Sequence, residues 1–376
     1  MPELFPDFQE LVAKNRVKFI SIDKKIFAYN VRDSFLVEVP DSMKIDEKVV
    51  EATTTPVKTL ILHTTYQCNL KCKHCYINAG EKRADEMDAE ELKRIVREFG
   101  QMGGLGVDLS GGEAMLKEGI EEVILEARNQ RLRTEVLTNA TDINSSLLKK
   151  ISPFIDGMAV GLDGISDSND VIRGQGTFDK AVAGLEQIAE QKIDLSFTTL
   201  LSPATIMQLT QFPEFMARYG ARSWSLVMPR ASGRFADEHA LVTETENFWQ
   251  EAVNQGILKE LQKLTRPLGI SVVLDHILVP GAKRKVEEKS TDIVYGMYNR
   301  GRACWDNTLR IMPNGDVKCC LFFDGQVYDN IREKSLREVY LSQRRRKALQ
   351  EFLRYPVDKC PFVEGLQLKR FEELIA

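Results

Sequence analysis

The sequence predicts an α/β fold built around a partial, TIM-like (βα)6 barrel, with a small β element before it and a cysteine-bearing domain after it. Between residues 58 and 235, six short apolar runs alternate with amphipathic helical stretches. That alternation is typical of a parallel sheet covered by helices. A closed barrel of this kind has eight units, so six indicate a partial barrel.

The barrel elements can be read from hydrophobic periodicity and from helix caps. The expected strands are Thr59–Thr65, Val107–Ser110, Arg133–Thr138, Gly157–Leu162, Leu195–Leu200 and Ser223–Met228. The expected helices span residues 88–99, 120–130, 144–151, 178–191 and 206–219. Asp88 precedes the first helix, where an aspartate can cap free N–H groups. Functional groups of such barrels gather at the carboxyl ends of the strands, so the residues after each strand are the candidates.

The first expected segment, residues 1–57, contains three short strands, at 17–21, 26–29 and 35–39. Polar, turn-compatible residues separate them, which is typical of a small antiparallel element. Such an element could plug the barrel, form a lid over it, or offer an edge strand to an extended peptide.

Two further segments follow the barrel, which spans residues 58–235. Residues 236–300 are expected to form a mostly helical bridge with one strand at 270–274. The last segment, residues 301–376, contains alternating residues around Pro313-Asn-Gly, typical of a β-hairpin, and then an expected helix at 335–353.

Composition narrows the class of protein. The 376 residues are 43% hydrophobic and carry a formal net charge of −4, which gives no sign of a nucleic-acid partner. No apolar stretch is long enough to cross a membrane, and residues 1–8 lack a signal-peptide pattern, so a cytoplasmic location is expected. The basic run at 344–347 reads as a solvated helix face or as a patch for an acidic partner.

Seven cysteines in a reducing compartment indicate metal ligands or reactive thiols before disulfides. Cys68, Cys72 and Cys75 follow the first barrel strand with the spacing C-x3-C-x2-C. Thiolates are the ligands that iron–sulfur clusters prefer, and three of them leave one iron of a cubane open. A structural zinc site takes four protein ligands, and His74 stands poorly placed between two of these cysteines to be the fourth.

This segment resembles the signature of the radical S-adenosylmethionine (SAM) superfamily. The resemblance implies that Cys68, Cys72 and Cys75 hold a [4Fe–4S] cluster whose open iron chelates the amino and carboxylate groups of SAM. The residue before the third cysteine is usually aromatic in that family. Here it is His74, followed by Tyr76 as a further cofactor contact, and the backbone of this position contacts adenine in the family.

Two further segments match motifs of the family, and they occur in the same order along the chain. Ser110-Gly111-Gly112-Glu113 follows the second strand and resembles the GGE motif. Glycines let a backbone approach a ligand closely, and Glu113 would accept a hydrogen bond from the SAM ammonium. Thr138-Asn139 ends the third strand and resembles the TNG element, with Ala140 in the place of glycine.

The remaining family matches concern the ribose and carboxylate of SAM. Gly161-Leu-Asp163-Gly resembles the S-x-D-G segment, with glycine replacing serine, and Asp163 would contact the ribose hydroxyls. Arg173 begins a run similar to RGxGxF and would pair with the SAM carboxylate. A salt bridge on the surface is the alternative for Asp163 and Arg173. Leu226 on the sixth strand would pack against adenine, or belong simply to the core.

The C-terminal cysteines resemble those of a second family module. Cys304, Gly315 and Cys320 follow the spacing C-x(9–15)-G-x4-C, and Cys360 lies downstream. This is similar to the auxiliary-cluster domains called SPASM and Twitch, and Pro229-x3-Gly233-Arg234 also looks like members of that subfamily. Too few cysteines remain for the two clusters of a SPASM domain. A single auxiliary iron–sulfur cluster on Cys304, Cys320 and Cys360 is therefore expected.

Cys319 directly precedes one of these expected ligands. Adjacent residues of a strand point to opposite faces, so a cluster-facing Cys320 would leave Cys319 facing away. Family members that epimerise peptides donate a hydrogen atom from such a cysteine, which makes Cys319 a candidate catalytic residue. Alternatives are a fourth cluster ligand, a small buried hydrophobe, or an exchange of roles within the pair.

The resemblance implies an enzyme that cleaves SAM reductively to methionine and a 5′-deoxyadenosyl radical, which abstracts hydrogen from its substrate. Members with this layout mostly modify ribosomally synthesised peptides, so epimerisation or thioether or carbon–carbon crosslinking of a peptide is the first hypothesis. A flavodoxin- or ferredoxin-type protein would supply the electron. Alternatives are a modifier of a small molecule or cofactor, and a non-catalytic iron–sulfur protein.

Overall fold

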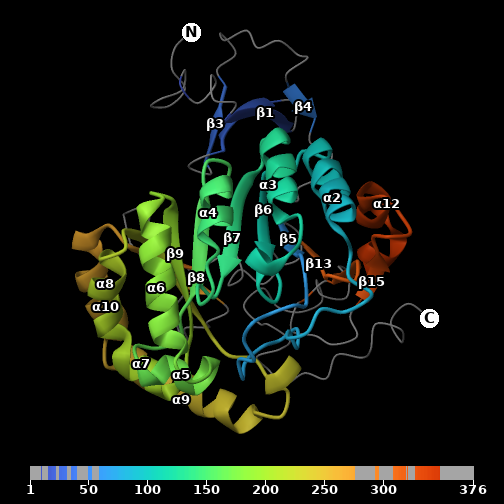
Figure 1. Ribbon diagram of the computed structural model, residues 1–376. Helices are drawn as coiled ribbons and strands as arrows, with labels where there is room; N and C mark the ends of the chain where they lie inside the picture. Colours follow the sequence, from blue (N-terminus) through green and yellow to red (C-terminus); the bar gives the residue numbers. More distant parts are fainter. Residues whose placement is uncertain are drawn as a thin grey trace.

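The computed structural model describes residues 10, 16–22, 25–31, 35–39, 50–52, 59–275, 293–295, 308–318, 320 and 327–347. Its main feature is an eleven-stranded sheet in the order β12-β11-β10-β9-β8-β7-β6-β5-β13-β14-β15. The strands from β5 to β12 run parallel to their neighbours, and helices cover their outer face (Figure 1). Within the described strands no pairing joins β12 to β15, so the barrel is open.

The six strands expected from the sequence are all present and in the expected order, which confirms the partial barrel. They are β5 (Thr59–His63), β6 (Gly106–Ser110), β7 (Arg133–Thr138), β8 (Gly157–Gly161), β9 (Asp194–Leu200) and β10 (Ala221–Val227). The sheet continues with β11 (Ser271–Asp275), β12 (Ile293–Tyr295), β13 (Thr308–Ile311), β14 (Asp316–Lys318) and β15 (Val327–Asn330).

The helices follow the expected alternation. The α-helices are α2 (Ala89–Gln101), α3 (Ile120–Asn129), α4 (Ser145–Ile151), α5 (Asp167–Arg173), α6 (Thr177–Glu190), α7 (Pro203–Gln208), α8 (Phe212–Ala217), α9 (His239–Asn254), α10 (Ile257–Thr265) and α12 (Leu336–Leu341). Short 3-10 turns are η2 (Ala114–Leu116), η3 (Leu209–Gln211), η4 (Gly233–Phe235) and η5 (Arg266–Leu268). Asp88 caps α2 as expected, in a capping box with Glu91. None of the described helices is long and apolar enough to cross a bilayer.

Two expected helices are interrupted. The stretch 206–219 consists of α7, η3 and α8, because Pro213 near the start of α8 has no N–H for a continuous helix. The expected helix at 335–353 ends as α12 at Leu341, where Ser342 takes an extended conformation. Helical residues resume at 343–347, and the rest of that prediction lies outside the described residues.

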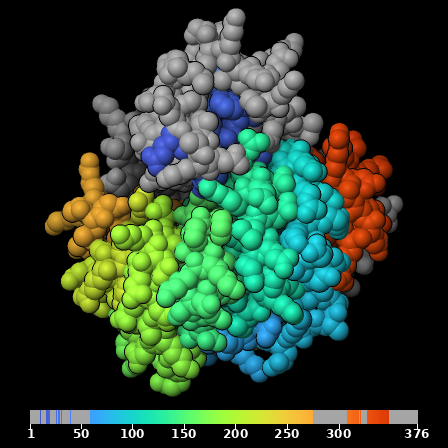
Figure 2. All heavy atoms as spheres, turned by 45° about the horizontal axis from the view of Figure 1, so that its top comes forward, coloured from blue at the N-terminus to red at the C-terminus, as the bar shows by residue number. Residues whose placement is uncertain are grey.

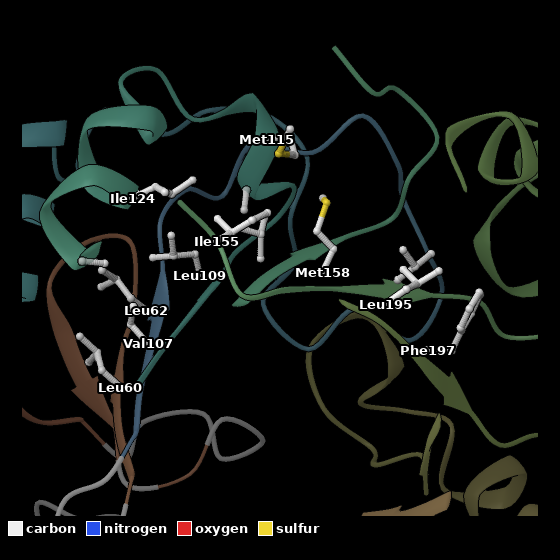
Figure 3. Close-up of a cluster of buried hydrophobic side chains, with 14 of the residues drawn as sticks. Leu60, Leu62, Val107, Leu109, Met115, Ile124, Ile155, Met158, Leu195 and Phe197 are labelled. Atoms are coloured by element: carbon white, nitrogen blue, oxygen red, sulfur yellow. The ribbon is translucent and has the colours of Figure 1, made fainter. Parts of the chain in front are cut away.

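The hydrophobic core lies between the sheet and its helices. Alternate residues of each strand point into it, as Leu60 and Leu62 of β5 and Val107 and Leu109 of β6 do (Figure 3). The intervening residues face the inside of the open barrel. Strand alternation thus separates the residues that stabilise the fold from those that line the lumen.

The C-terminal elements join the same sheet. β13 pairs in parallel with β5, with Arg310 opposite Ile61, and β13, β14 and β15 then form antiparallel pairs. Arg332 donates to the carboxylate of Glu91 and to the carbonyl oxygens of Asp85 and Glu86, 2.8–3.1 Å away. The elements around the second cysteine group are therefore tied directly to the loop that carries the first.

The N-terminal strands form a separate sheet in the order β3-β2-β1-β4, from β1 (Val17–Ile22), β2 (Lys25–Asn30), β3 (Phe35–Glu38) and β4 (Val50–Ala52). The antiparallel β1-β2-β3 arrangement was expected, and the parallel β4 was not. This sheet lies over one end of the barrel (Figures 1 and 2).

That end is the amino-terminal end of the barrel strands. The buried Lys18 ammonium donates to the carbonyl oxygens of Gly100, at the end of α2, and Gly104, just before β6, at 3.3 and 3.0 Å. Arg16 forms a buried ion pair with Asp156, just before β8. Of the three roles considered, these contacts agree with a plug, because a lid would cover the opposite, carboxyl end.

We expect Arg16→Met to weaken the docking of the N-terminal sheet. The substitution leaves the buried Asp156 carboxylate without its cation, which costs about 3–5 kcal/mol. Denaturant unfolding would measure it. Arg222→Met is the matched control, because Arg222 pairs with Asp194 in the open, 63% and 38% exposed, and such pairs contribute about 0–1 kcal/mol. Equal stability losses in the two variants would contradict the buried contact.

Candidate cofactor site at the carboxyl ends of the strands

The loop between β5 and α2 carries Cys68, Cys72 and Cys75. Its two branches are joined where the Cys68 N–H donates to the Gly80 carbonyl oxygen at 2.7 Å and the Gly80 N–H donates to that of Tyr66 at 2.8 Å. Glu86 holds the base of the loop, since its carboxylate accepts from the backbone N–H of Tyr66 at 2.9 Å. The three thiols thus sit on a fixed loop.

Polar hydrogens point at two of the sulfurs. The Leu70 N–H lies 3.4 Å from Cys68 Sγ, and the Ala79 N–H lies 3.3 Å from Cys75 Sγ. The side-chain amide of Asn139 lies 3.8 Å from Cys68 Sγ. Such donors stabilise thiolates bound to a metal and tune its potential.

Burial disfavours the charged form of these thiols when no metal is bound. It raises the pKa of Cys68 to about 11, against the lowering by the Leu70 N–H, and it raises the pKa of Cys72. Thiolates here therefore need a cation to stabilise them, which an iron–sulfur cluster provides. No group of three or more His, Cys, Asp or Glu side chains in the described segments could hold a single metal ion. In a cubane each thiolate binds a different iron, so its three ligands need not converge on one point.

The Gly111-Gly112 pair packs against the backbone that leads into Cys68. The Gly112 N–H donates to the Thr65 carbonyl oxygen at 2.7 Å, and the Glu113 N–H donates to that of Gln67 at 2.8 Å. A Cβ on Gly112 would lie 2.2 Å from the Gln67 oxygen, and Gly111 has a φ of +146°. These glycines therefore fit the cysteine loop itself, and their neighbour Ser110 accepts from the Thr64 N–H at 2.8 Å.

Glu113 links the ends of β6 and β7. Its buried carboxylate accepts from the backbone N–H of Asn139 at 2.8 Å and from that of Met115 at 3.1 Å. Burial raises its pKa, although these donors oppose the shift. Thr138 accepts from the N–H of Ala140, whose φ of 58° explains why glycine is common at that place. The expected motifs are thus brought together around the cysteine loop.

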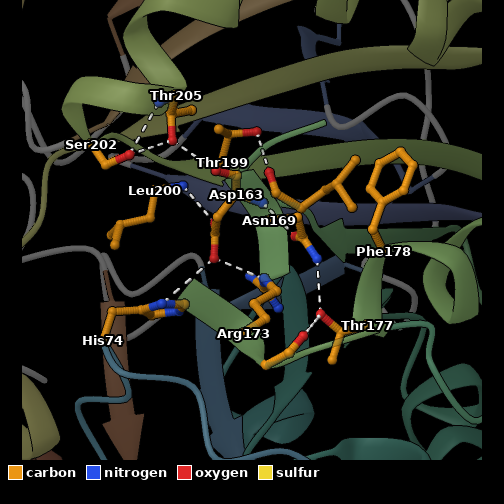
Figure 4. A network of polar contacts seen from close by, with 12 residues as sticks. His74, Asp163, Asn169, Arg173, Thr177, Phe178, Thr199, Leu200, Ser202 and Thr205 are labelled. Atoms are coloured by element: carbon orange, nitrogen blue, oxygen red, sulfur yellow. Dashed lines mark hydrogen bonds and ion pairs between the residues drawn. The ribbon is translucent and has the colours of Figure 1, made fainter. Parts of the chain in front are cut away.

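Asp163 and Arg173 form an ion pair with each other, and it is buried rather than at the surface. Arg173 Nε lies 2.7 Å from Asp163 Oδ2, and His74 Nδ1 lies 3.5 Å from the same oxygen (Figure 4). The other oxygen accepts from the Leu200 N–H at 2.8 Å. Burial opposes ionisation of Asp163, but the Arg173 guanidinium and the Leu200 N–H outweigh it and hold its pKa below the usual value.

These contacts bear on the roles expected of Asp163. Its side chain is 1% exposed, and both of its oxygens already have partners within the protein. It is therefore placed to orient Arg173 and His74, and the ribose contact remains a prediction. The side chain missing at position 161 has a structural reason, since a Cβ on Gly161 would lie 2.5 Å from the Arg173 guanidinium.

Tyr76 and His63 form a contact that sequence reasoning missed. The Tyr76 hydroxyl lies 2.8 Å from Nε2 of His63, which is the last residue of β5 and is fully buried. Burial lowers the pKa of His63 to about 3, with Lys318 and Arg310 adding to it, and burial raises that of Tyr76. The position of His63, at an inward-facing strand end, was the only signal for it.

The other expected site residues are placed as follows. Leu226 is buried in the main core with Trp224, which agrees with the core alternative. Cys320 is buried after β14. Cys304, Cys319 and Cys360 lie outside the described residues, so their roles stay predictions.

A second polar group lines the lumen below the cysteine loop. Asp108 and Glu135 are register partners on β6 and β7, on the strand faces opposite the core. Glu135 accepts from Arg133 Nη1 at 3.1 Å and from Ser196 Oγ at 2.9 Å. Burial and the neighbouring Glu135 raise the pKa of Asp108 to about 7. Sequence reasoning missed this pair, although polar residues at alternate positions of two strands could have signalled it.

The fold and the three-thiol loop define a class: an open parallel barrel with a cysteine-rich site at the carboxyl ends of its strands. Residues 62–215 match the model of the Radical SAM superfamily. The chain therefore carries a radical SAM domain, which confirms the expected resemblance.

Relatives of known name cover part of the chain. Mycofactocin maturase MftC of Mycolicibacterium smegmatis is 31% identical over 177 residues, which are 46% of this chain and 45% of that protein. Fe-coproporphyrin III synthase of Methanosarcina barkeri is 32% identical over 163 residues, or 42% of this chain and 41% of that protein. The chain thus spans about half the length of the curated relatives it matches.

The fold extends over more of the chain. Streptococcus suis SuiB bound to S-adenosylmethionine superposes with a TM-score of 0.69 at 14% identity, covering 95% of this chain and 97% of that one. The anSMEcpe structure with bound AdoMet and Cp18Cys peptide gives a TM-score of 0.58 at 17% identity, with 79% and 83% covered. At these identities the likeness concerns the fold, and it agrees with the expected TIM-like barrel.

We expect Gly112→Ala to displace the cysteine loop, because the added methyl group overlaps the Gln67 carbonyl oxygen. Overpacking of this kind costs about 1–3 kcal/mol. Iron and sulfide per chain after anaerobic reconstitution should fall, and thermal unfolding should shift downward. Gly80→Ala is the control on the same loop, because a Cβ on Gly80 meets nothing within 4 Å. Full iron uptake by Gly112→Ala would contradict the packing argument.

The raised pKa of Asp108 predicts that the stability of the fold depends on pH. This pKa rises from 3.8 in the unfolded chain to about 7 in the fold, so the folded state binds more protons between those values. This contribution to stability is therefore lost as pH rises through that window. Asp108→Asn should raise the unfolding free energy at pH 8 by on the order of 1 kcal/mol, and not at pH 4. The exposed Asp142→Asn is the control, and an effect that is equal at both pH values would sink the assignment.

Proposed function

We propose that this protein is a radical SAM enzyme that modifies a ribosomally synthesised peptide. The observation that carries the proposal is the Cys68-Cys72-Cys75 loop, with N–H groups directed at its sulfurs, at the carboxyl ends of the strands of a radical SAM domain. A [4Fe–4S] cluster and SAM would supply reductive cleavage to methionine and a 5′-deoxyadenosyl radical.

The chain's own residues would hold these cofactors. Cys68, Cys72 and Cys75 would bind three irons, and the donors to their sulfurs would stabilise the reduced cluster. Glu113 would accept from the SAM ammonium, and Arg173, held by Asp163, would meet its carboxylate. Preorganised charges of this kind need no rearrangement when the cofactor binds.

The peptide substrate is supported by likeness to proteins named for it. SuiB has been solved bound to the precursor peptide SuiA, at a TM-score of 0.66, and anSMEcpe with the Cp18Cys peptide. MftC is named as the maturase of mycofactocin. An open barrel also suits a substrate too large to be enclosed. The electron would come from a flavodoxin- or ferredoxin-type protein.

A tetrapyrrole or another small molecule is the second candidate substrate. The observation that favours it is the similarity to Fe-coproporphyrin III synthase and, at 31% identity over 170 residues, to pre-heme d1 synthase of Dinoroseobacter shibae. Incubation with SAM, reductant and either substrate class would decide between them.

We expect the anaerobically reconstituted protein to release 5′-deoxyadenosine from SAM when reduced. Substituting the three site cysteines by alanine together should abolish this activity, because no open iron would remain for SAM. Liquid chromatography with mass spectrometry measures the product. A protein that takes up a cluster but never yields 5′-deoxyadenosine would overturn the proposed enzyme.

A Cys319 variant and heavy water distinguish epimerisation of a peptide from crosslinking. If the Cys319 thiol donates hydrogen to a Cα radical, the centre is inverted, and the resulting thiyl radical must be reduced and protonated afterwards. Cys319→Ala should then stop epimer formation while SAM cleavage continues. Heavy water should add deuterium to an epimerised peptide, whereas a crosslinked product loses two hydrogens. Normal epimer from this variant would rule out the thiol as donor.

A further inference from the structure

The turn η4 lies directly against the cysteine loop. Arg234 in this turn makes three hydrogen bonds to the loop, all to carbonyl oxygens. Its backbone N–H donates to Cys75 at 3.0 Å, its Nε donates to Cys72 at 2.9 Å, and its Nη1 donates to Ala79 at 2.6 Å. One residue therefore fixes the backbone before, at and after the third cysteine.

Close packing fixes the same contact from the neighbouring position. Gly233 has a φ of 57°, and a Cβ there would lie 2.3 Å from the Cys75 carbonyl oxygen and 2.6 Å from the Tyr76 Cα. Any larger residue would push the turn away from the loop. The sequence indicated the Gly233-Arg234 pair only through its likeness to a subfamily. In the structure, Gly233 allows the close approach of the turn to the cysteine loop, and Arg234 forms hydrogen bonds to that loop.

The contact is also electrostatic. The Arg234 guanidinium brings a positive charge to the loop, because it donates to the carbonyl oxygens of Cys72 and Ala79, at 2.9 and 2.6 Å. Arg173 is committed to Asp163, with Nε and Oδ2 at 2.7 Å. Among the described ion pairs none includes Arg234, and its guanidinium is directed at the loop carbonyl oxygens.

We propose that Arg234 is a positioning residue that closes the three-thiol loop into its cluster-binding form and places a positive charge beside the cluster. The proposal rests on the proposed function, since it needs a cluster on Cys68, Cys72 and Cys75. The planar guanidinium holds Nε and Nη1 apart in a fixed fork, which meets the carbonyl oxygens of Cys72 and Ala79, whereas a lysine ammonium presents all its donors from a single atom. The fork and the charge can therefore be tested separately.

The experiment compares Arg234→Lys and Arg234→Met after anaerobic reconstitution of the full chain. Arg234→Met should release cluster iron to a chelator about tenfold faster, because it loses two charge-assisted hydrogen bonds. Its cluster midpoint potential, followed by electron paramagnetic resonance, should be more negative, since a nearby cation favours the reduced cluster. Arg234→Lys should keep the potential and still release iron faster. Arg222→Met is the control, because Arg222 forms an exposed ion pair with Asp194. Its rate of iron release and its cluster potential should match those of the unmodified protein.

Each outcome decides the proposal. Iron release and potential unchanged in both variants would overturn it, and faster release with an unchanged potential in Arg234→Met would remove the electrostatic part. If Arg234→Met does not fold, Arg234→Lys alone decides, because release at the unmodified rate contradicts a role for the fork. Failure of the unmodified protein to take up any cubane would instead sink the proposed function.

Discussion

The fit of one backbone loop against three other segments is the constraint on which the site depends. The loop after β5 meets the glycine pair after β6, the turn η4 after β10, and the hairpin between β13 and β14, where the Met87 N–H donates to the Pro313 carbonyl oxygen at 2.7 Å. Each of these segments makes at least one hydrogen bond between backbone atoms to the loop, and such a contact cannot be relieved by a side-chain rotation. Residues such as Gly112 and Gly233 are therefore required by the geometry of the loop as much as by any ligand.

A second feature is the buried charge network beside that loop. Asp163 neutralises Arg173 and contacts His74, and it is fixed in turn by the Leu200 N–H. Buried ion pairs contribute little net stability, but they fix orientation. The barrel thus holds a guanidinium at its carboxyl end in a defined position before any cofactor binds. The N-terminal sheet docks on the opposite end of the barrel strands.

The sequence predicted the strands and helices of the barrel well, because apolar periodicity and caps are local. It also predicted which motifs gather, since every parallel strand ends at the same edge of the sheet. It could not predict partners set by long-range packing: that β13 pairs with β5, that Arg16 reaches Asp156, or that Arg173 turns back to Asp163. The break before α8 could have been predicted from Pro213, which lacks an N–H. The end of the barrel on which β1 docks could not, because it depends on contacts between residues far apart in the chain.

The departures from family motifs are where the structure adds most. Glycine at position 161 leaves room for the Arg173 guanidinium, and Ala140 accepts a positive φ that glycine adopts more easily. His74 stands in the place of the usual aromatic residue and contacts Asp163. Gly161 and His74 both adjoin the buried Asp163–Arg173 ion pair, so two of these departures lie at the same network.

The central claim is that three thiolates hold a cubane with one iron open to SAM. Mössbauer spectroscopy of 57Fe-reconstituted protein, before and after SAM is added, tests it most directly. The account predicts that one iron of a cubane changes its isomer shift when SAM binds while the others do not. A spectrum indifferent to SAM, or a site that takes zinc in preference to iron, would contradict it.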